Sequence, residues 1–135
     1  MSTRSAIGYT TPTGSIRSVY CHFDGYIYDG VGEMLATEYQ AAYRVAQLVE
    51  MGDISSLGRT PFTSTFYGRD RNEPFTETGK YDSLLEYNEA FSDDVDYMYL
   101  YTREGWLVKS KEGYYTRLDE LLEVETEEMK ALAND

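Results

Sequence analysis

The run Cys21-His22-Phe23-Asp24 brings a nucleophile, a base and a carboxylate together in the sequence. Neighbouring side chains of a strand point to opposite faces, so Cys21 and His22 cannot form a catalytic pair there. His22 and Asp24 share a face, where the carboxylate would orient the imidazole as a general base. The alternative is a structural hydrogen bond at a strand end. Because His22 is the only histidine and zinc-type spacing is absent, the sequence predicts no metal site and no cofactor, with a magnesium site made of carboxylates alone as the alternative.

Two arginines flank an acid in the run Arg69-Asp70-Arg71, directly after a predicted strand over residues 62–68. Such guanidinium groups would bind a phosphate or carboxylate through bidentate hydrogen bonds, or else anchor the loop through internal salt bridges. Glycine-rich phosphate loops are absent. If this strand lies beside the one that carries His22, the protein would be a small enzyme or nucleotide-binding protein. The predicted ligand pocket then consists of His22, Asp24, Arg69, Asp70 and Arg71.

The chain carries 24 acidic and 12 basic residues, which gives a net charge of -12 and a pI near 4.4. This charge argues against direct binding to nucleic acid or to an anionic membrane, because both need a cationic face. Residues 82–135 contain fifteen acids and five bases, so this part carries -10 of the total. An acidic docking surface and ordinary solvated helix faces both account for this distribution.

Tyrosine accounts for 14 aromatic residues, against 5 Phe and 1 Trp, and Tyr97, Tyr99 and Tyr101 alternate along a predicted strand. Three phenol groups on one face would form a protein-binding surface, cover an outer sheet face, or pack beneath a helix. Nearby carboxylates would mimic DNA phosphates and occupy a basic partner surface. The predicted partner-binding residues are Asp93, Asp94, Asp96, Tyr97, Tyr99, Tyr101, Glu120, Glu123 and Glu127.

The elements that must position these residues follow from periodicity and turn signals. Residues 5–9 and 15–23 predict a hairpin, and an amphipathic stripe over residues 31–51 predicts either one helix or two. Residues 53–58 indicate a tight turn, and Ser83-x-x-Glu86 indicates the cap of a helix that ends at Ala90. Residues 97–102 and 106–108 predict a second hairpin, and an acidic helix is predicted at about residues 116–133.

Together these elements predict a single α+β domain over residues 1–135. Its expected architecture is a small antiparallel sheet of four to five strands, with two to three helices packed on one face. The single cysteine excludes an internal disulfide, and neither a signal peptide nor a membrane span is visible in the sequence. We therefore expect a soluble cytosolic protein.

Four motifs give the chain a resemblance to known proteins: MSTRSAIG at residues 1–8, SVYCHFDGY at 18–26, GDISSLG at 52–58 and YGRDR at 67–71. With the hairpin over residues 96–107, they resemble a group of small proteins found in phages, prophages and mobile elements. That group has Trp where this chain has Phe23, and a break between two helices near Gln40 that is not evident here. The resemblance implies a setting and transfers no catalytic residue.

The phage setting implies a non-enzymatic inhibitor of a host defence system, of the anti-CRISPR or anti-restriction type, that acts in the host cytoplasm. Its partner would be a host defence protein or ribonucleoprotein with a basic surface, and a homodimer is left open. The alternatives are the ligand-binding protein or enzyme described above, and a structural component of a phage particle.

Overall fold

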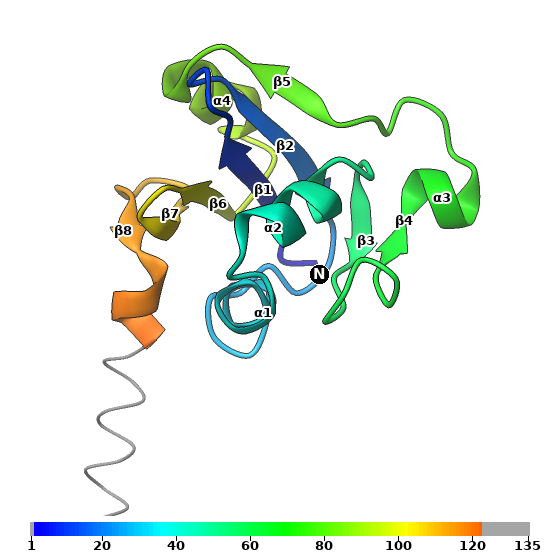
Figure 1. The fold of residues 1–135 in the computed structure, drawn as a ribbon, viewed down its shortest axis with the longest axis horizontal. Coiled ribbons are helices and arrows are strands. Elements are labelled where there is room, and N and C mark those ends of the chain that lie inside the picture. Colours follow the sequence, from blue (N-terminus) through cyan, green and yellow to red (C-terminus); the bar gives the residue numbers. More distant parts are fainter. Residues whose placement is uncertain (1, 123–135) are drawn as a thin grey trace, which may run out of the picture.

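Strand β1 (Ser5–Thr10) lies at the centre of the sheet, between two partner strands (Figure 1). In this computed structural model, which describes residues 2–122, β1 pairs antiparallel with β2 (Ile16–Cys21) and parallel with β6 (Tyr97–Thr102). The turn between β1 and β2 is closed by the Thr11 N–H, which donates to the Ser15 carbonyl over 2.8 Å. The predicted first hairpin is confirmed.

Within the described residues the sheet has eight strands and is mixed, with the order β4-β3-β2-β1-β6-β7-β8 and β5 also on β2. The further strands are β3 (Ile54–Ser56), β4 (Thr65–Phe66), β5 (Gly79–Tyr81), β7 (Gly105–Ser110) and β8 (Thr116–Arg117). The α+β class is correct, but the sheet is larger than predicted and is not purely antiparallel. The parallel pairs β1·β6 and β2·β3 join segments distant in sequence, which local turn signals do not reveal.

Three segments differ from the elements expected for them. The strand expected over residues 62–68 is reduced to β4, and the chain is helical from Tyr67. Residues 53–58 were expected to form a turn, yet they contain β3, which is held by the His22 N–H donating to the Ile54 carbonyl over 3.0 Å. The helix expected from residue 116 is preceded by the short strand β8 and begins at Leu118. Its predicted continuation from residue 123 to about residue 133 lies outside the described residues.

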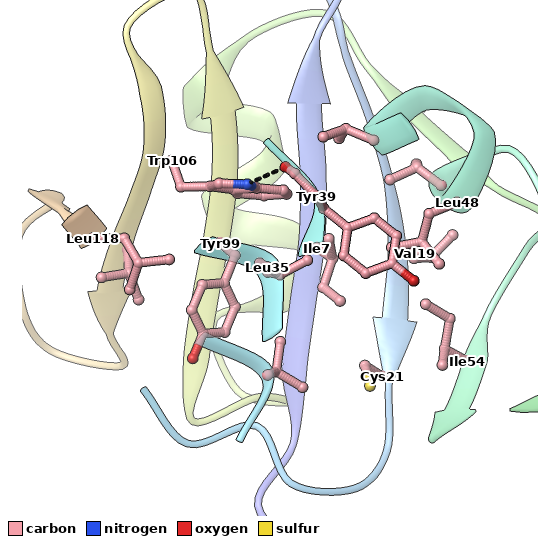
Figure 2. Close-up of a cluster of buried hydrophobic side chains, with 14 of the residues drawn as sticks. Ile7, Val19, Cys21, Leu35, Tyr39, Leu48, Ile54, Tyr99, Trp106 and Leu118 are labelled. Atoms are coloured by element: carbon pink, nitrogen blue, oxygen red, sulfur yellow. Dashed lines mark hydrogen bonds between the residues drawn. The ribbon is translucent and has the colours of Figure 1, made fainter. Parts of the chain in front are cut away.

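The helical stripe forms two helices, α1 (Val31–Glu38) and α2 (Ala42–Val49), with a joint at Tyr39. The Tyr39 side chain is fully buried, and its carbonyl accepts the indole N–H of Trp106 over 2.9 Å, as Figure 2 shows. Both helices contribute to a core on one sheet face, around Ile7, Val19 and Tyr99. This buried contact explains why the polypeptide turns at a position where the apolar stripe alone shows no break.

Helix α4 (Leu84–Phe91) covers the opposite face of the sheet. Its Tyr87 packs in a second core with Ala6 and Met98, whereas the neighbouring Ile7 points into the first core. The expectation of helices on one face is therefore wrong, because successive residues of β1 are buried on both sides. The predicted cap of α4 is confirmed, since the Ser83 hydroxyl accepts the Glu86 N–H over 3.2 Å. The remaining helix, α3 (Tyr67–Arg71), follows β4 directly.

Candidate functional site

The imidazole of His22 is engaged by two hydroxyl groups and not by Asp24. Its Nδ1 lies 2.7 Å from the Tyr20 hydroxyl and its Nε2 lies 3.2 Å from the Ser2 hydroxyl. Asp24 lies beyond the end of β2 with a left-handed φ of 59°, and its carbonyl accepts the Val31 N–H over 2.7 Å. Strand alternation has ended there, so the predicted His22–Asp24 pair does not form.

Arg69 is committed to acceptors of its own segment. Its guanidinium donates to the Asp70 carboxylate and to the Pro61 and Ser64 carbonyls, over 3.0 and 2.6 Å, and lies 4.7 Å from the Phe66 ring centre. The hydrogen bond from Arg69, followed by the one from the Phe66 N–H, lowers the pKa of Asp70. These contacts correspond to the loop-anchoring interpretation of this motif.

The second arginine of the motif, Arg71, lies 5.2 Å from the ring centre of Tyr67, its neighbour on α3. Within residues 2–122, no hydrogen bond or ion pair joins Arg69 or Arg71 to His22 or Asp24. The five residues of the predicted ligand pocket therefore do not share one set of contacts, because His22 and Asp24 have different partners and the arginines contact residues 61–70.

The tyrosine row of β6 does share a face, as its alternation predicted, but that face is the one covered by α1 and α2. Tyr99 is fully buried, and its hydroxyl donates to the Gly25 carbonyl over 2.7 Å. Tyr101 is half-buried and donates to the Gln40 carbonyl over 2.7 Å, and Tyr97 is also half-buried. The exposed phenolic surface expected here is therefore wrong for Tyr99, and packing beneath helices explains the row.

The predicted acidic loop at Asp93, Asp94 and Asp96 is exposed, but cations accompany it. With Arg4 and Lys111, these residues line a hollow of about 350 Å³. Asp96 also has a structural task, because its carboxylate accepts the Arg4 backbone N–H over 3.0 Å.

The remaining predicted acids belong to the C-terminal segment. Glu120 is exposed and lies 3.8 Å from the guanidinium of Arg117, so its charge is partly offset as well. Glu123 and Glu127 lie outside the described residues.

A more acidic hollow lies elsewhere, between the loop of residues 23–30, helix α1 and the segment after β3. Its volume is about 310 Å³, and four carboxylates line it together with a single base, Arg59. Apolar atoms come from Phe23, Val31, Met34 and Leu57. We call this feature the acidic hollow. Its carboxylates belong to Asp24, Asp29, Glu33 and Glu38.

Backbone hydrogen bonds fix the loop that forms this hollow. The Gly25 N–H donates to the Thr3 carbonyl over 2.9 Å, and the Gly32 N–H donates to the Tyr26 carbonyl over 3.0 Å. Gly30 is packed so closely that a Cβ atom there would lie 2.4 Å from the Asp24 carbonyl oxygen. These contacts already fix the backbone of the loop. A partner would therefore not have to order the loop when it binds.

Exposed aromatic side chains accompany the carboxylates of the loop. Phe23, Tyr26 and Tyr28 are 42, 48 and 41% exposed. In the sequence, Asp24-Gly25 indicates only the end of a strand, so this site was not predicted. The available signal was the group of three aromatic and two acidic residues within residues 23–29, directly before a helix whose first turn carries Glu33.

No family model, curated protein or solved structure matches this chain. The acidic hollow must therefore be interpreted from its own geometry. Among residues 2–122, no group of three or more His, Cys, Asp or Glu side chains is arranged to hold a metal ion. No helix in this part of the chain has the length and apolar character needed to cross a membrane.

Proposed function

We propose that this protein is a non-enzymatic binding protein that recognises a basic surface of another protein through the acidic hollow. The observation that supports this proposal is the composition of the hollow, where four carboxylates meet one arginine around apolar atoms. A lysine or arginine of a partner would lay its aliphatic stem against Met34 and Leu57 and direct its charged end at the carboxylates. The exposed ring of Phe23 adds a cation–π surface for that charge.

The net charge of -12 extends this preference beyond the hollow itself. A field of this sign accelerates encounters with a basic partner and disfavours nucleic acid and anionic membranes. Because the backbone of residues 23–30 is already fixed, less conformational entropy is lost on binding.

The resemblance to small phage and mobile-element proteins supplies the biological setting of the proposal. In that setting, the partner is a host defence protein or ribonucleoprotein whose basic nucleic-acid channel the acidic surface would occupy. The protein would then act in the host cytoplasm as an inhibitor of the anti-CRISPR or anti-restriction type. This assignment rests on the class of proteins that the motifs resemble and on charge complementarity.

The proposal is tested by capturing partners from host lysates, with and without an active defence system, and then measuring affinity with the purified partner. The double variant Asp29→Asn with Glu38→Lys changes the charge of the hollow by three units. We expect it to weaken binding at least about tenfold, or about 1.4 kcal/mol. Raising the salt concentration from about 0.05 M to about 0.5 M should weaken wild-type binding as well, because it shortens the screening length.

A matched control changes the same charge away from the hollow. Glu104→Gln with Glu112→Lys alters two exposed acids in the turns on either side of β7 and should retain nearly wild-type affinity. Asp93→Asn with Asp94→Lys tests the loop that the sequence favoured. If all three double variants bind alike, recognition does not use a particular acidic surface and the proposal fails.

A further inference from the structure

The largest hollow that we describe shares no lining residue with the acidic hollow and lies where three segments meet. It has a volume of about 670 Å³ and is bordered by the turn after β1, the first half of α2 and the end of β6. Three tyrosine rings line it together with a proline and an arginine. We call it the tyrosine groove, with Tyr9, Pro12, Tyr43, Tyr101 and Arg103 as its main residues.

Two of the three rings are held in place by their own hydroxyl groups. Tyr9 donates to the Glu50 carboxylate over 2.8 Å, and Tyr101 donates to the Gln40 carbonyl over 2.7 Å. The Tyr101 ring also packs edge-on against Trp106, with 5.2 Å between ring centres. Tyr43 is 72% exposed. The groove therefore offers positioned aromatic surface, while two hydroxyl groups are already used inside the protein.

The charge of the groove is opposite to that of the rest of the protein. No carboxylate lines it, whereas at least one carboxylate lines each of the other three hollows. Arg103 is exposed and makes no hydrogen bond or ion pair with any residue of the described part. Glu50, which accepts the Tyr9 hydroxyl, is bound by Arg17, and this hydrogen bond is the main cause of its lowered pKa.

We propose that the tyrosine groove binds a nucleotide, with the base stacked on Tyr43 and Tyr101 and the phosphate bound by Arg103. A nucleotide joins the two chemistries that the lining offers, a flat ring for the aromatic side chains and an anion for the unpaired guanidinium. Thr10, whose hydroxyl has no partner among residues 2–122, adds a donor at the rim. This site is separate from the acidic hollow and goes beyond the proposed function.

An extended peptide fits the groove less well. Peptides commonly add to the edge of a sheet or dock as proline-rich segments in aromatic-lined grooves, where free donors such as tyrosine hydroxyls would bind the peptide carbonyl groups. Here β1 and β6 are both paired on each side, so neither offers an edge. The hydroxyls of Tyr9 and Tyr101 are already engaged. A ligand that uses ring faces and one anionic contact is therefore favoured.

The test is calorimetric titration of the purified protein with adenosine 5′-monophosphate and the other common nucleoside monophosphates. Adenosine lacks the anion and ribose 5-phosphate lacks the ring, so each should bind at least about tenfold more weakly than the complete nucleotide. Trp106 is the only tryptophan and contacts Tyr101, so base stacking should also change its fluorescence. No detectable binding of any nucleoside monophosphate would overturn the proposal.

Variants locate the binding. Tyr43→Ala and Arg103→Gln should each weaken nucleotide binding by about tenfold or more. The matched controls Tyr114→Ala, at a tyrosine that is 92% exposed, and Arg59→Gln, in the acidic hollow, should not. Urea unfolding checks that all four variants fold.

Equal affinity in all four variants would refute the site. If the protein binds a proline-rich peptide and only Tyr43→Ala weakens that binding, the ligand of the groove is a peptide and the nucleotide proposal is wrong. The Tyr43 and Arg103 variants should leave capture of a basic partner unchanged, so failure here and failure of the proposed function are distinguishable.

Discussion

Asp53 supplies a hydrogen bond at the point where β2 changes its outer partner. Ser18 of β2 pairs with β5, and Cys21 pairs with β3. Between them the Tyr20 N–H has no strand partner on this side and donates instead to the Asp53 carboxylate over 2.9 Å. The Asp53 N–H donates in turn to the Thr76 carbonyl over 2.8 Å. The Asp53 side chain thus completes the hydrogen bonding of β2 at the point where its partner changes from β5 to β3.

Replacing Asp53 with Ala removes this acceptor and leaves the Tyr20 N–H unpaired. Such a group costs about 1–3 kcal/mol when buried. Because Tyr20 is half-buried, water reaches it in part, and we expect a loss of about 1–2 kcal/mol in the free energy of unfolding. With a urea m-value of about 2 kcal/mol/M, in the middle of the usual range, the urea midpoint should fall by roughly 0.5–1 M.

Replacing Asp53 with Asn keeps an acceptor oxygen and removes the charge. Burial is the main cause that raises the pKa of Asp53 in the folded protein. The folded protein therefore binds the Asp53 proton more tightly than the unfolded chain does. This contributes stability below the unfolded pKa, near 3.9, and that stability is lost as the pH rises through the folded pKa. Asp53→Asn should therefore be at least as stable as the wild type at neutral pH, and this advantage should shrink toward about pH 4.

Urea unfolding followed by circular dichroism, at neutral and acidic pH, measures both effects. Asp93→Ala serves as the control, because Asp93 is exposed and the same atoms are removed. If Asp53→Ala and Asp93→Ala lose equal stability, the side chain does not support the Tyr20 N–H and the reasoning is wrong.

Two further predictions concern a thiol and a helix end. Cys21 is fully buried, and burial raises the pKa of its thiol to about 12, so a thiol reagent should modify it only as fast as the protein unfolds. Rapid labelling of the native protein, measured against urea-unfolded protein, would contradict this. Ala41 caps α2 with extended φ and ψ of -88 and 138° but has no side-chain acceptor, so Ala41→Ser should raise the unfolding free energy by about 0.5–1 kcal/mol. Ala41→Val should give no such gain, and an unchanged midpoint for Ala41→Ser would show that its hydroxyl does not reach the helix N–H groups.

The parts of the fold that were predictable from the sequence depend on nearby residues. The first hairpin and the Ser83 cap follow from turn and capping chemistry within a few positions. The joint at Tyr39 was left open because its cause is Trp106, 67 positions away. Alternation correctly placed the tyrosines of β6 on one face, but it could not reveal that α1 and α2 cover that face.

The acidic hollow depends on long-range geometry in the same way. Asp24 and Asp29 come from a loop, Glu33 and Glu38 from a helix, and Arg59 from a segment beyond β3. Each is an ordinary charged residue in the sequence, and only the loop's close packing against the chain near Thr3 brings them to one hollow. The sequence instead favoured the acids of residues 93–96, where the local charge density is higher but Arg4 and Lys111 lie beside them.

The position of β1 has a consequence for biosynthesis. This strand is made before its parallel partner β6, and Ser5 pairs with Tyr97, 92 positions later. At about 5–20 residues per second, the ribosome completes β6 on the order of 5–20 s after β1 has been translated. During that interval β1 can pair only with β2, so its other side is open to chaperones or to other growing chains.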